Sequence, residues 1–136
     1  MKKLQFLFIF LILILLFSLT ACNSVYDEAT TSFTITMDDF NFDPEKVTIP
    51  TDEEITITLI NKRSTGHKWA LMNTPVESPF DANDEANIFY AIEVEAGKIT
   101  TATFYSPAAA GEYEMVCAIP GHPEGDLIGK VIVVQP

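Results

Sequence analysis

Residues 111–130 read Gly-Glu-Tyr-Glu-Met-Val-Cys-Ala-Ile-Pro-Gly-His-Pro-Glu-Gly-Asp-Leu-Ile-Gly-Lys, which is a strand pattern followed by a turn. Alternate residues of a strand face the same side, so Met115 and Cys117 share the face that we expect to point into the core. The Pro-Gly pair at 120–121 then predicts a sharp turn that returns His122 toward the Cys117 sulfur. This stretch predicts a thiol and an imidazole at one end of a β structure.

The only other histidine is His67, in the segment Gly66-His67-Lys68-Trp69, fifty residues before Cys117. Two imidazoles and one thiolate are the ligand set of a blue-copper site, and trigonal N,N,S ligation suits both oxidation states of copper. Burial raises the pKa of an unpartnered thiol, and a bound metal removes that difficulty by deprotonating it. These residues favour one copper ion in the domain.

Three alternatives use the same residues. A zinc site with an open position can take the same ligands. Cys117 can also be an inert buried thiol, with His67 a satisfied polar residue at a strand end. A Cys-His hydrolase needs a third orienting group and an oxyanion hole, and the sequence offers neither. We therefore do not expect an enzyme.

The N-terminus has the pattern of an export signal. Lys2 and Lys3 precede an apolar run at 6–17, which is too short for a membrane-spanning helix, since a span needs about 20 residues. The following Leu19-Thr20-Ala21-Cys22 resembles the bacterial lipobox, at which the new N-terminal cysteine is lipidated. We expect residues 1–21 to be removed and Cys22 to anchor the protein to a bacterial membrane, outside the cytoplasm. The alternative is an ordinary cleaved signal followed by a free cysteine.

Without residues 1–21 the chain has 115 residues and a formal charge of −13, a length typical of one domain. This acidity argues against nucleic acid or anionic lipid as a partner and favours cationic partners, or simply solubility. If Cys22 carries lipid, Cys117 has no partner for an intramolecular disulfide. We expect a monomer.

Residues 22–32 are polar and aperiodic and are interpreted as a tether, so the domain is expected at 33–136. Alternating or apolar segments separated by turn residues predict seven or eight short strands, and 73–87 is expected to be a long loop with room for one helical turn around 82–86. The predicted strands are 33–37, 47–50, 55–59, 67–71, 88–94, 99–105, 112–117 and 131–134. Together they predict an all-β sandwich.

The segments 40–44 (Phe-Asn-Phe-Asp-Pro), 66–69, 111–117 and 120–122 resemble those of the cupredoxins, the plastocyanin and azurin family of small blue-copper proteins. The resemblance covers 33–136. It implies a Greek-key sandwich with one copper ion held at one end by His67, Cys117 and His122. It also implies that the protein transfers single electrons between extracytoplasmic or membrane-bound partners; the alternative function is copper storage or delivery.

The axial position departs from the family pattern. Plastocyanin-type loops have a weakly bound methionine five residues after the second histidine and two before a glycine, and this position is Leu127. An azurin-type count gives Asp126 instead, but the glycine register favours Leu127. Leu127 would be non-ligating, which leaves the Gly66 carbonyl as the one weak axial contact; Met115 and Met72 are interpreted as core residues.

The family commonly has Asn after the first histidine and Ser or Thr after the cysteine, and these side chains connect the two ligand loops. This chain has Lys68 and Ala118, so the expected site lacks that connection, is less rigid and has a cation near the metal. His122 is the expected electron port. The expected apolar contact patch around it consists of Ile119, Pro120 and Pro123.

Overall fold

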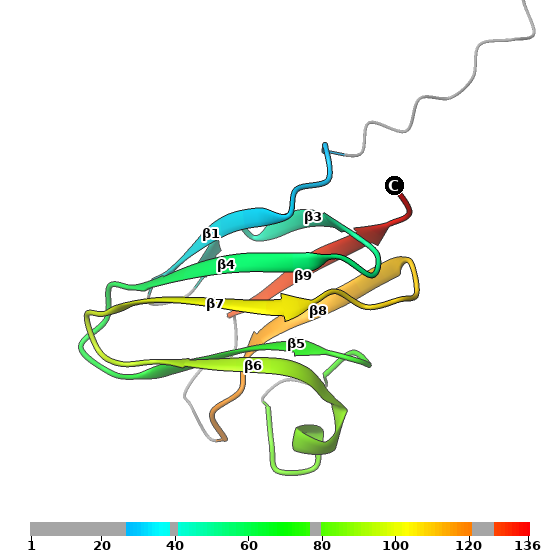
Figure 1. Ribbon diagram of the computed structural model, residues 1–136. Coiled ribbons are helices and arrows are strands. Elements are labelled where there is room, and N and C mark those ends of the chain that lie inside the picture. Colours follow the sequence, from blue (N-terminus) through cyan, green and yellow to red (C-terminus); the bar gives the residue numbers. More distant parts are fainter. Residues whose placement is uncertain (1–26, 39–40, 77–79, 121–126) are drawn as a thin grey trace, which may run out of the picture.

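Nine strands form two packed sheets in the computed structural model, which describes residues 27–38, 41–76, 80–120 and 127–136 (Figure 1). The strands are β1 Ser32–Met37, β2 Phe42–Asp43, β3 Lys46–Pro50, β4 Glu54–Asn61, β5 His67–Met72, β6 Ile88–Val94, β7 Ile99–Tyr105, β8 Gly111–Cys117 and β9 Ile128–Val134, and the short 3-10 helix η1 is Asp84–Asn87. The predicted all-β sandwich is confirmed.

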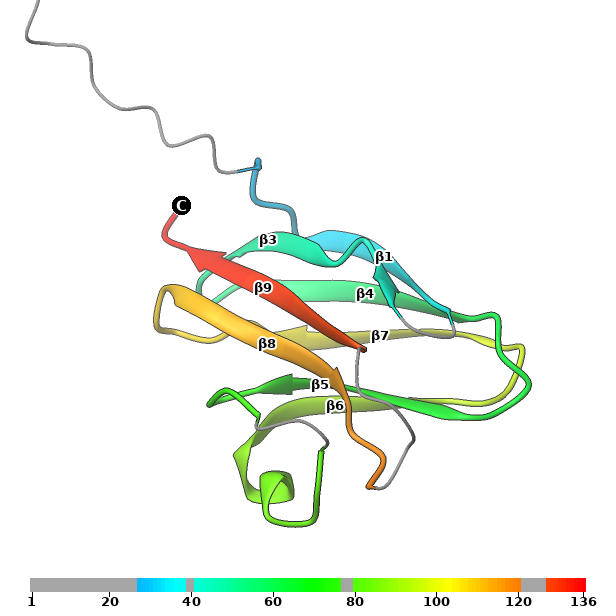
Figure 2. The same ribbon diagram turned by 180° about the vertical axis from the view of Figure 1, so that it is seen from behind.

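The first sheet has the order β2-β1-β4-β7 and the second β3-β9-β8-β5-β6. The β1–β4 and β3–β9 pairs are parallel, and the other pairs are antiparallel. The view from behind shows the second sheet, in which β8 lies between β9 and β5 (Figure 2). The strand that ends at Cys117 is therefore next to the strand that begins at His67.

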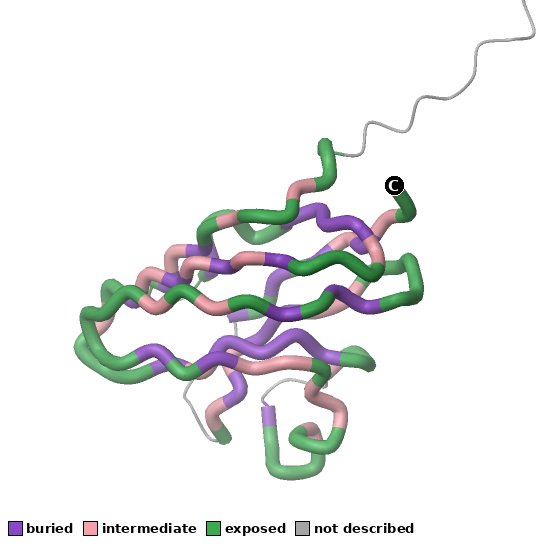
Figure 3. Tube along the Cα trace, viewed as in Figure 1, coloured by how far each residue is buried: buried purple, intermediate pink, exposed green. Residues whose placement is uncertain are grey.

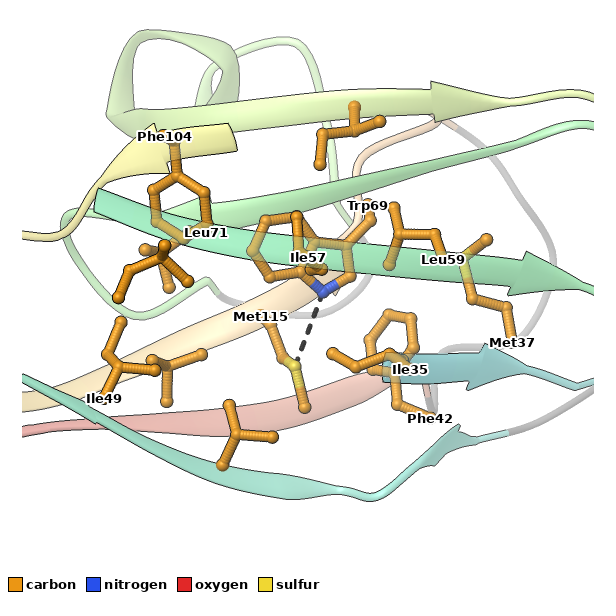
Figure 4. Close-up of a cluster of buried hydrophobic side chains, with 14 of the residues drawn as sticks. Ile35, Met37, Phe42, Ile49, Ile57, Leu59, Trp69, Leu71, Phe104 and Met115 are labelled. Carbon is orange, nitrogen blue, oxygen red and sulfur yellow. Dashed lines mark hydrogen bonds between the residues drawn. The ribbon is translucent and has the colours of Figure 1, made fainter. Parts of the chain in front are cut away.

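The core fills the space between the sheets because their strands alternate apolar and polar residues. In β4, Ile55, Ile57 and Leu59 point inward, while Thr56, Thr58 and Ile60 lie on the outer face, an alternation of buried and half-buried residues that is visible along the chain trace (Figure 3). The Trp69 indole lies in this core near Ile57, Leu59 and Phe104 (Figure 4). Apolar burial of this kind is the main force that holds two sheets together.

A second, smaller apolar cluster lies on the other side of β5 and β8. It consists of Ala70, Met72, Phe80, Val116 and Ala118, with Val76, Ile88 and Ala91 packed against it. The connection between β5 and β6 supplies Phe80 and Val76, and the Val76 amide donates to the Glu114 carboxylate over 2.8 Å. The Cys117 strand is thus covered on both faces.

Most predicted strand positions are confirmed, with small differences at the ends. Between the predicted strands 33–37 and 47–50 the structure adds the two-residue strand β2, which is too short to show any periodicity. Strand β9 begins at Ile128, three residues before the predicted start, because its first residues pair with β8. The helical turn lies at Asp84–Asn87, slightly later than expected.

The described N-terminal segment runs beside β3, where Asp27 pairs with Lys46 at 3.1 Å and the Thr30 amide donates to the Thr48 carbonyl. It lies near the C-terminus, above β1 and β3 in the view of Figure 1 and away from the β4–β5 and β6–β7 connections. No helix among the described residues is long and apolar enough to cross a membrane. The predicted signal peptide, Cys22 and the first part of the tether lie outside the described residues.

Candidate metal centre

Two of the predicted ligands meet at one end of the sandwich. Trp69 of β5 is the ladder partner of Cys117 of β8, and residues opposite each other in an antiparallel pair share a face. His67, two residues before Trp69, therefore also faces the core. Its Nδ1 atom lies 3.3 Å from Sγ of Cys117.

Burial controls the protonation of this pair. His67 is 2% exposed, and Cys117 is half-buried and not in a disulfide. Desolvation raises the pKa of the Cys117 thiol above its ordinary value of 9.0, while the backbone amides of Lys68 and Ile119 and the Arg63 charge act in the lowering direction. Because desolvation prevails, Cys117 is a neutral thiol near pH 7 when no metal is bound.

The backbone connects the two ligand segments. The Ala118 amide donates to the Lys68 carbonyl over 2.7 Å, and the Cys117 amide donates to the Leu127 carbonyl over 3.2 Å. Lys68 and Ala118 are the two positions at which the family's side-chain connection is absent. A main-chain hydrogen bond between the same two residues joins the loops, which the sequence reasoning did not anticipate.

The residues considered for the axial position lie in different surroundings. Leu127 is 8% exposed and packs in the main core. Gly66 is exposed and borders a pocket of about 260 Å³ beside His67. Met115 and Met72 are fully buried in the main core and the second cluster, as expected. The pocket is lined by Gly66, His67, Lys68, Glu93, Val94, Glu95 and Ile119.

The donor pair fits a soft metal ion. Ligand bonds of about 2.0 Å to nitrogen and about 2.3 Å to sulfur place the two donors about 3.3–3.7 Å apart at bond angles of about 100–120°. The observed Nδ1–Sγ distance of 3.3 Å, a hydrogen bond between the two side chains in the metal-free protein, lies at the lower end of this range. Among the described residues, no group of three His, Cys, Asp or Glu side chains could hold a metal ion. His122, Pro123 and Asp126 lie outside the described residues, so the third ligand stays a prediction.

No role was assigned from the sequence to two residues of the segment between the predicted strands 55–59 and 67–71, Asn61 and Arg63. Arg63 brings positive charge near the Cys117 sulfur. Asn61 is buried and bonded to several backbone groups around the start of β5. No sequence signal distinguished Asn61 from an ordinary turn residue, because its burial and its backbone partners are visible only in the fold.

A family model described as "Cupredoxin-like domain" matches residues 7–129. The dithionite-reduced auracyanin of the photosynthetic bacterium Roseiflexus castenholzii is similar in structure, with 27% identity and a TM-score of 0.65 over 79% of this chain and 100% of that chain. No curated protein sequence matches.

Two more distant structures support the fold alone. Auracyanin A, a "blue" copper protein of Chloroflexus aurantiacus, is 21% identical, with a TM-score of 0.61 over 76% of this chain and 98% of that chain. Rusticyanin of Thiobacillus ferrooxidans is 22% identical, with a TM-score of 0.55 over 78% of this chain and 79% of that chain.

Proposed function

Because the chain belongs to the cupredoxin-like domain family, we propose that it is a blue-copper electron carrier that binds one copper ion through His67, Cys117 and His122. The observation that carries the proposal is the 3.3 Å contact between the His67 imidazole and the Cys117 thiol at one end of the sandwich. Copper would supply reversible exchange of one electron at this position.

The protein's own residues would keep the ligands in place during that exchange. His67 and Cys117 lie on paired strands, and the Ala118–Lys68 hydrogen bond joins the segments that carry them. The burial of His67 excludes water from its side of the site. A site built on a rigid ladder needs little rearrangement when an electron arrives or leaves, so a carrier function suits this geometry better than an enzyme function.

The domain would work outside the cytoplasm, attached to a bacterial membrane through lipid on Cys22. The proposed division is a signal at 1–21, a lipidated tether at 22–32 and a domain at 33–136. The contacts of Asp27 and Thr30 with β3 support this arrangement, because β3 is the strand of the five-stranded sheet that lies farthest from β5, which carries His67, and from β6. The anchor would leave the redox end free to meet partners.

The proposed partners are one-electron redox proteins that dock at the ligand loop. In that loop Ile119 is half-buried and Pro120 is exposed, which supports an apolar contact there. His122 and Pro123 would complete the contact. The formal charge of −13 without residues 1–21 favours cationic partners.

The test is an optical and spin-resonance spectrum of the purified domain with Cu(II) added. We expect an intense thiolate-to-copper band that is absent in Cys117→Ser, because a hydroxyl does not replace the soft sulfur. Gly111→Ala, remote from the site, is the control and should keep the band. A wild-type spectrum without this band rules out the site; a blue protein that loses Cu(I) rapidly to a chelator would instead indicate copper delivery.

A further inference from the structure

The Asn61 side chain is hydrogen-bonded to four backbone groups at the metal end of the sandwich. Asn61 is the last residue of β4 and is 2% exposed. Its amide nitrogen lies 2.8 Å from the Thr65 carbonyl, 3.1 Å from that of Glu95 and 3.2 Å from that of Val94. Its Oδ1 atom accepts from the Arg63 amide over 2.9 Å.

This arrangement engages both the nitrogen and the oxygen of the Asn61 carboxamide. A carboxamide has two N–H hydrogens, which are shared here among three carbonyls, and its oxygen serves as an acceptor. Glutamine, serine or aspartate could not reproduce the pattern in the same space, because each changes the length or the donor set. The site therefore requires asparagine specifically.

The four backbone groups belong to the segments that place His67. Arg63 and Thr65 lie in the loop that crosses from the first sheet to the second and ends at His67. Val94 is the ladder partner of His67 on β6. Asn61 thus connects the end of β4, in the first sheet, to two segments next to His67: the loop before it and the end of β6 in the second sheet.

We propose that Asn61 is a positioning residue for His67: it fixes the loop that leads into His67 and the strand paired with it, and so sets where the imidazole lies relative to Cys117. The Ala118–Lys68 hydrogen bond joins the two ligand strands to each other. Asn61 in turn fixes the loop before His67 and the strand beside it. The expected effect of Asn61 on copper properties rests on the proposed copper function. Its positioning of His67 does not.

A matched control lies at the opposite end of the sandwich. Ser106 is also buried, at 4% exposure, and its hydroxyl is bonded to the Glu53 backbone. Ser106→Ala removes a buried side-chain-to-backbone interaction of the same kind without touching the metal end. Any effect that Ser106→Ala shares with the Asn61 variants reflects a general loss of stability.

The first test needs no metal. In the metal-free protein, the nuclear Overhauser cross-peak between the His67 ring and the Cys117 β protons reports their contact, and hydrogen exchange reports the Arg63 amide. In Asn61→Ala we expect a weakened cross-peak and a loss of Arg63 amide protection of about tenfold. Asn61→Asp keeps the acceptor for Arg63 but places an oxygen against three carbonyls, so it should lose the cross-peak with less effect on Arg63. Ser106→Ala should change neither the cross-peak nor the protection of the Arg63 amide.

The second test uses the copper-loaded protein. Both Asn61 variants should shift the thiolate-to-copper band and slow electron self-exchange, while Ser106→Ala keeps both at the wild-type values. An unchanged cross-peak and band in the Asn61 variants, or equal changes in Ser106→Ala, would overturn the positioning role. If the wild type has no such band, the copper proposal fails, and the metal-free cross-peak still decides the role of Asn61.

Discussion

The indole N–H of Trp69 donates to the thioether sulfur of Met115, with 3.5 Å between nitrogen and sulfur (Figure 4). Both residues are fully buried, and Trp69 is the ladder partner of Cys117. The sulfur of Met115 is therefore engaged inside the core, although Met115 lies only two residues before the proposed copper ligand. A buried indole N–H needs an acceptor, and this sulfur supplies it.

Met115→Leu should destabilise the domain by about 1–2 kcal/mol, because it leaves the buried indole N–H of Trp69 without its acceptor. The colour of the copper-loaded protein should not change. Denaturant unfolding gives the stability, and Met72→Leu, in the second cluster, is the control for exchanging methionine for leucine. If Met115→Leu is no more costly than Met72→Leu, the N–H to sulfur contact contributes nothing measurable.

The raised pKa of Cys117 predicts a pH dependence of the metal-free protein. Its folded-state pKa lies above the ordinary 9.0 of the unfolded chain, chiefly because of burial. The folded state therefore holds the proton more tightly, and this contribution to stability is complete below pH 9 and is lost as pH rises from 9 through the folded pKa. The unfolding midpoint of the metal-free protein should fall as pH rises through this window, and the fall should be smaller in Cys117→Ser. An equal fall of the midpoint with pH in the two proteins would contradict a buried neutral thiol.

The sequence predicted those parts of the molecule in which local pattern and tertiary environment agree. Alternation in β1 and β4 was enough to place both strands, because each has one face in the core. The closeness of His67 and Cys117 also followed, because the resemblance to the cupredoxins implied that both residues lie at one end of the sandwich.

The unpredicted features depend on contacts between segments that are remote in sequence. The two-residue strand β2 exists only because β1 pairs with it. Asparagine is a common residue in turns, and only the fold shows that the carbonyls of Val94 and Glu95 lie around Asn61. The Ala118–Lys68 hydrogen bond is a main-chain interaction, so no side-chain pattern could indicate it.

Gly129 is required where β9 passes Met115. A Cβ atom added at Gly129 would contact the Met115 side chain and lie 2.7 Å from the Glu45 carbonyl oxygen, which is part of the backbone and cannot easily move. Gly129→Ala should destabilise the domain by about 1–3 kcal/mol through overpacking. Gly111→Ala is the control, because its nearest neighbour would be 3.8 Å away. Thermal unfolding checks both, and equal stability of the two variants would show that β9 can shift at no cost.

Cys22 is expected to carry the lipid. Cys22→Ser should not be labelled by a radioactive fatty acid, and the unlabelled protein should leave the membrane fraction, because a hydroxyl does not replace the thiol in lipid transfer at a lipobox. Cys117→Ser should remain labelled, which makes it the control for loss of a cysteine elsewhere. Continued labelling of Cys22→Ser would refute the anchor.

Leu127 is the proposed axial residue, and its carbonyl already accepts the Cys117 amide over 3.2 Å. A thioether donates weakly to copper and favours the oxidised ion, so a leucine at this position should favour Cu(I) and raise the reduction potential. Its burial acts in the same direction, because an apolar shell disfavours the more highly charged oxidised site. Leu127→Met should therefore lower the potential.

Leu127→Met is a clean comparison because the exchange nearly conserves volume and should cost less than about 1.5 kcal/mol. Leu71→Met, at a buried leucine on β5, is the control for a new thioether elsewhere in the core and should leave the potential unchanged. Protein-film voltammetry gives the potentials, and the optical spectrum shows that each variant is folded and blue. If Leu127→Met keeps or raises the potential, Leu127 is not the axial residue. Asp126 and Gly66, the other two residues considered for the axial contact, are then the positions to substitute next.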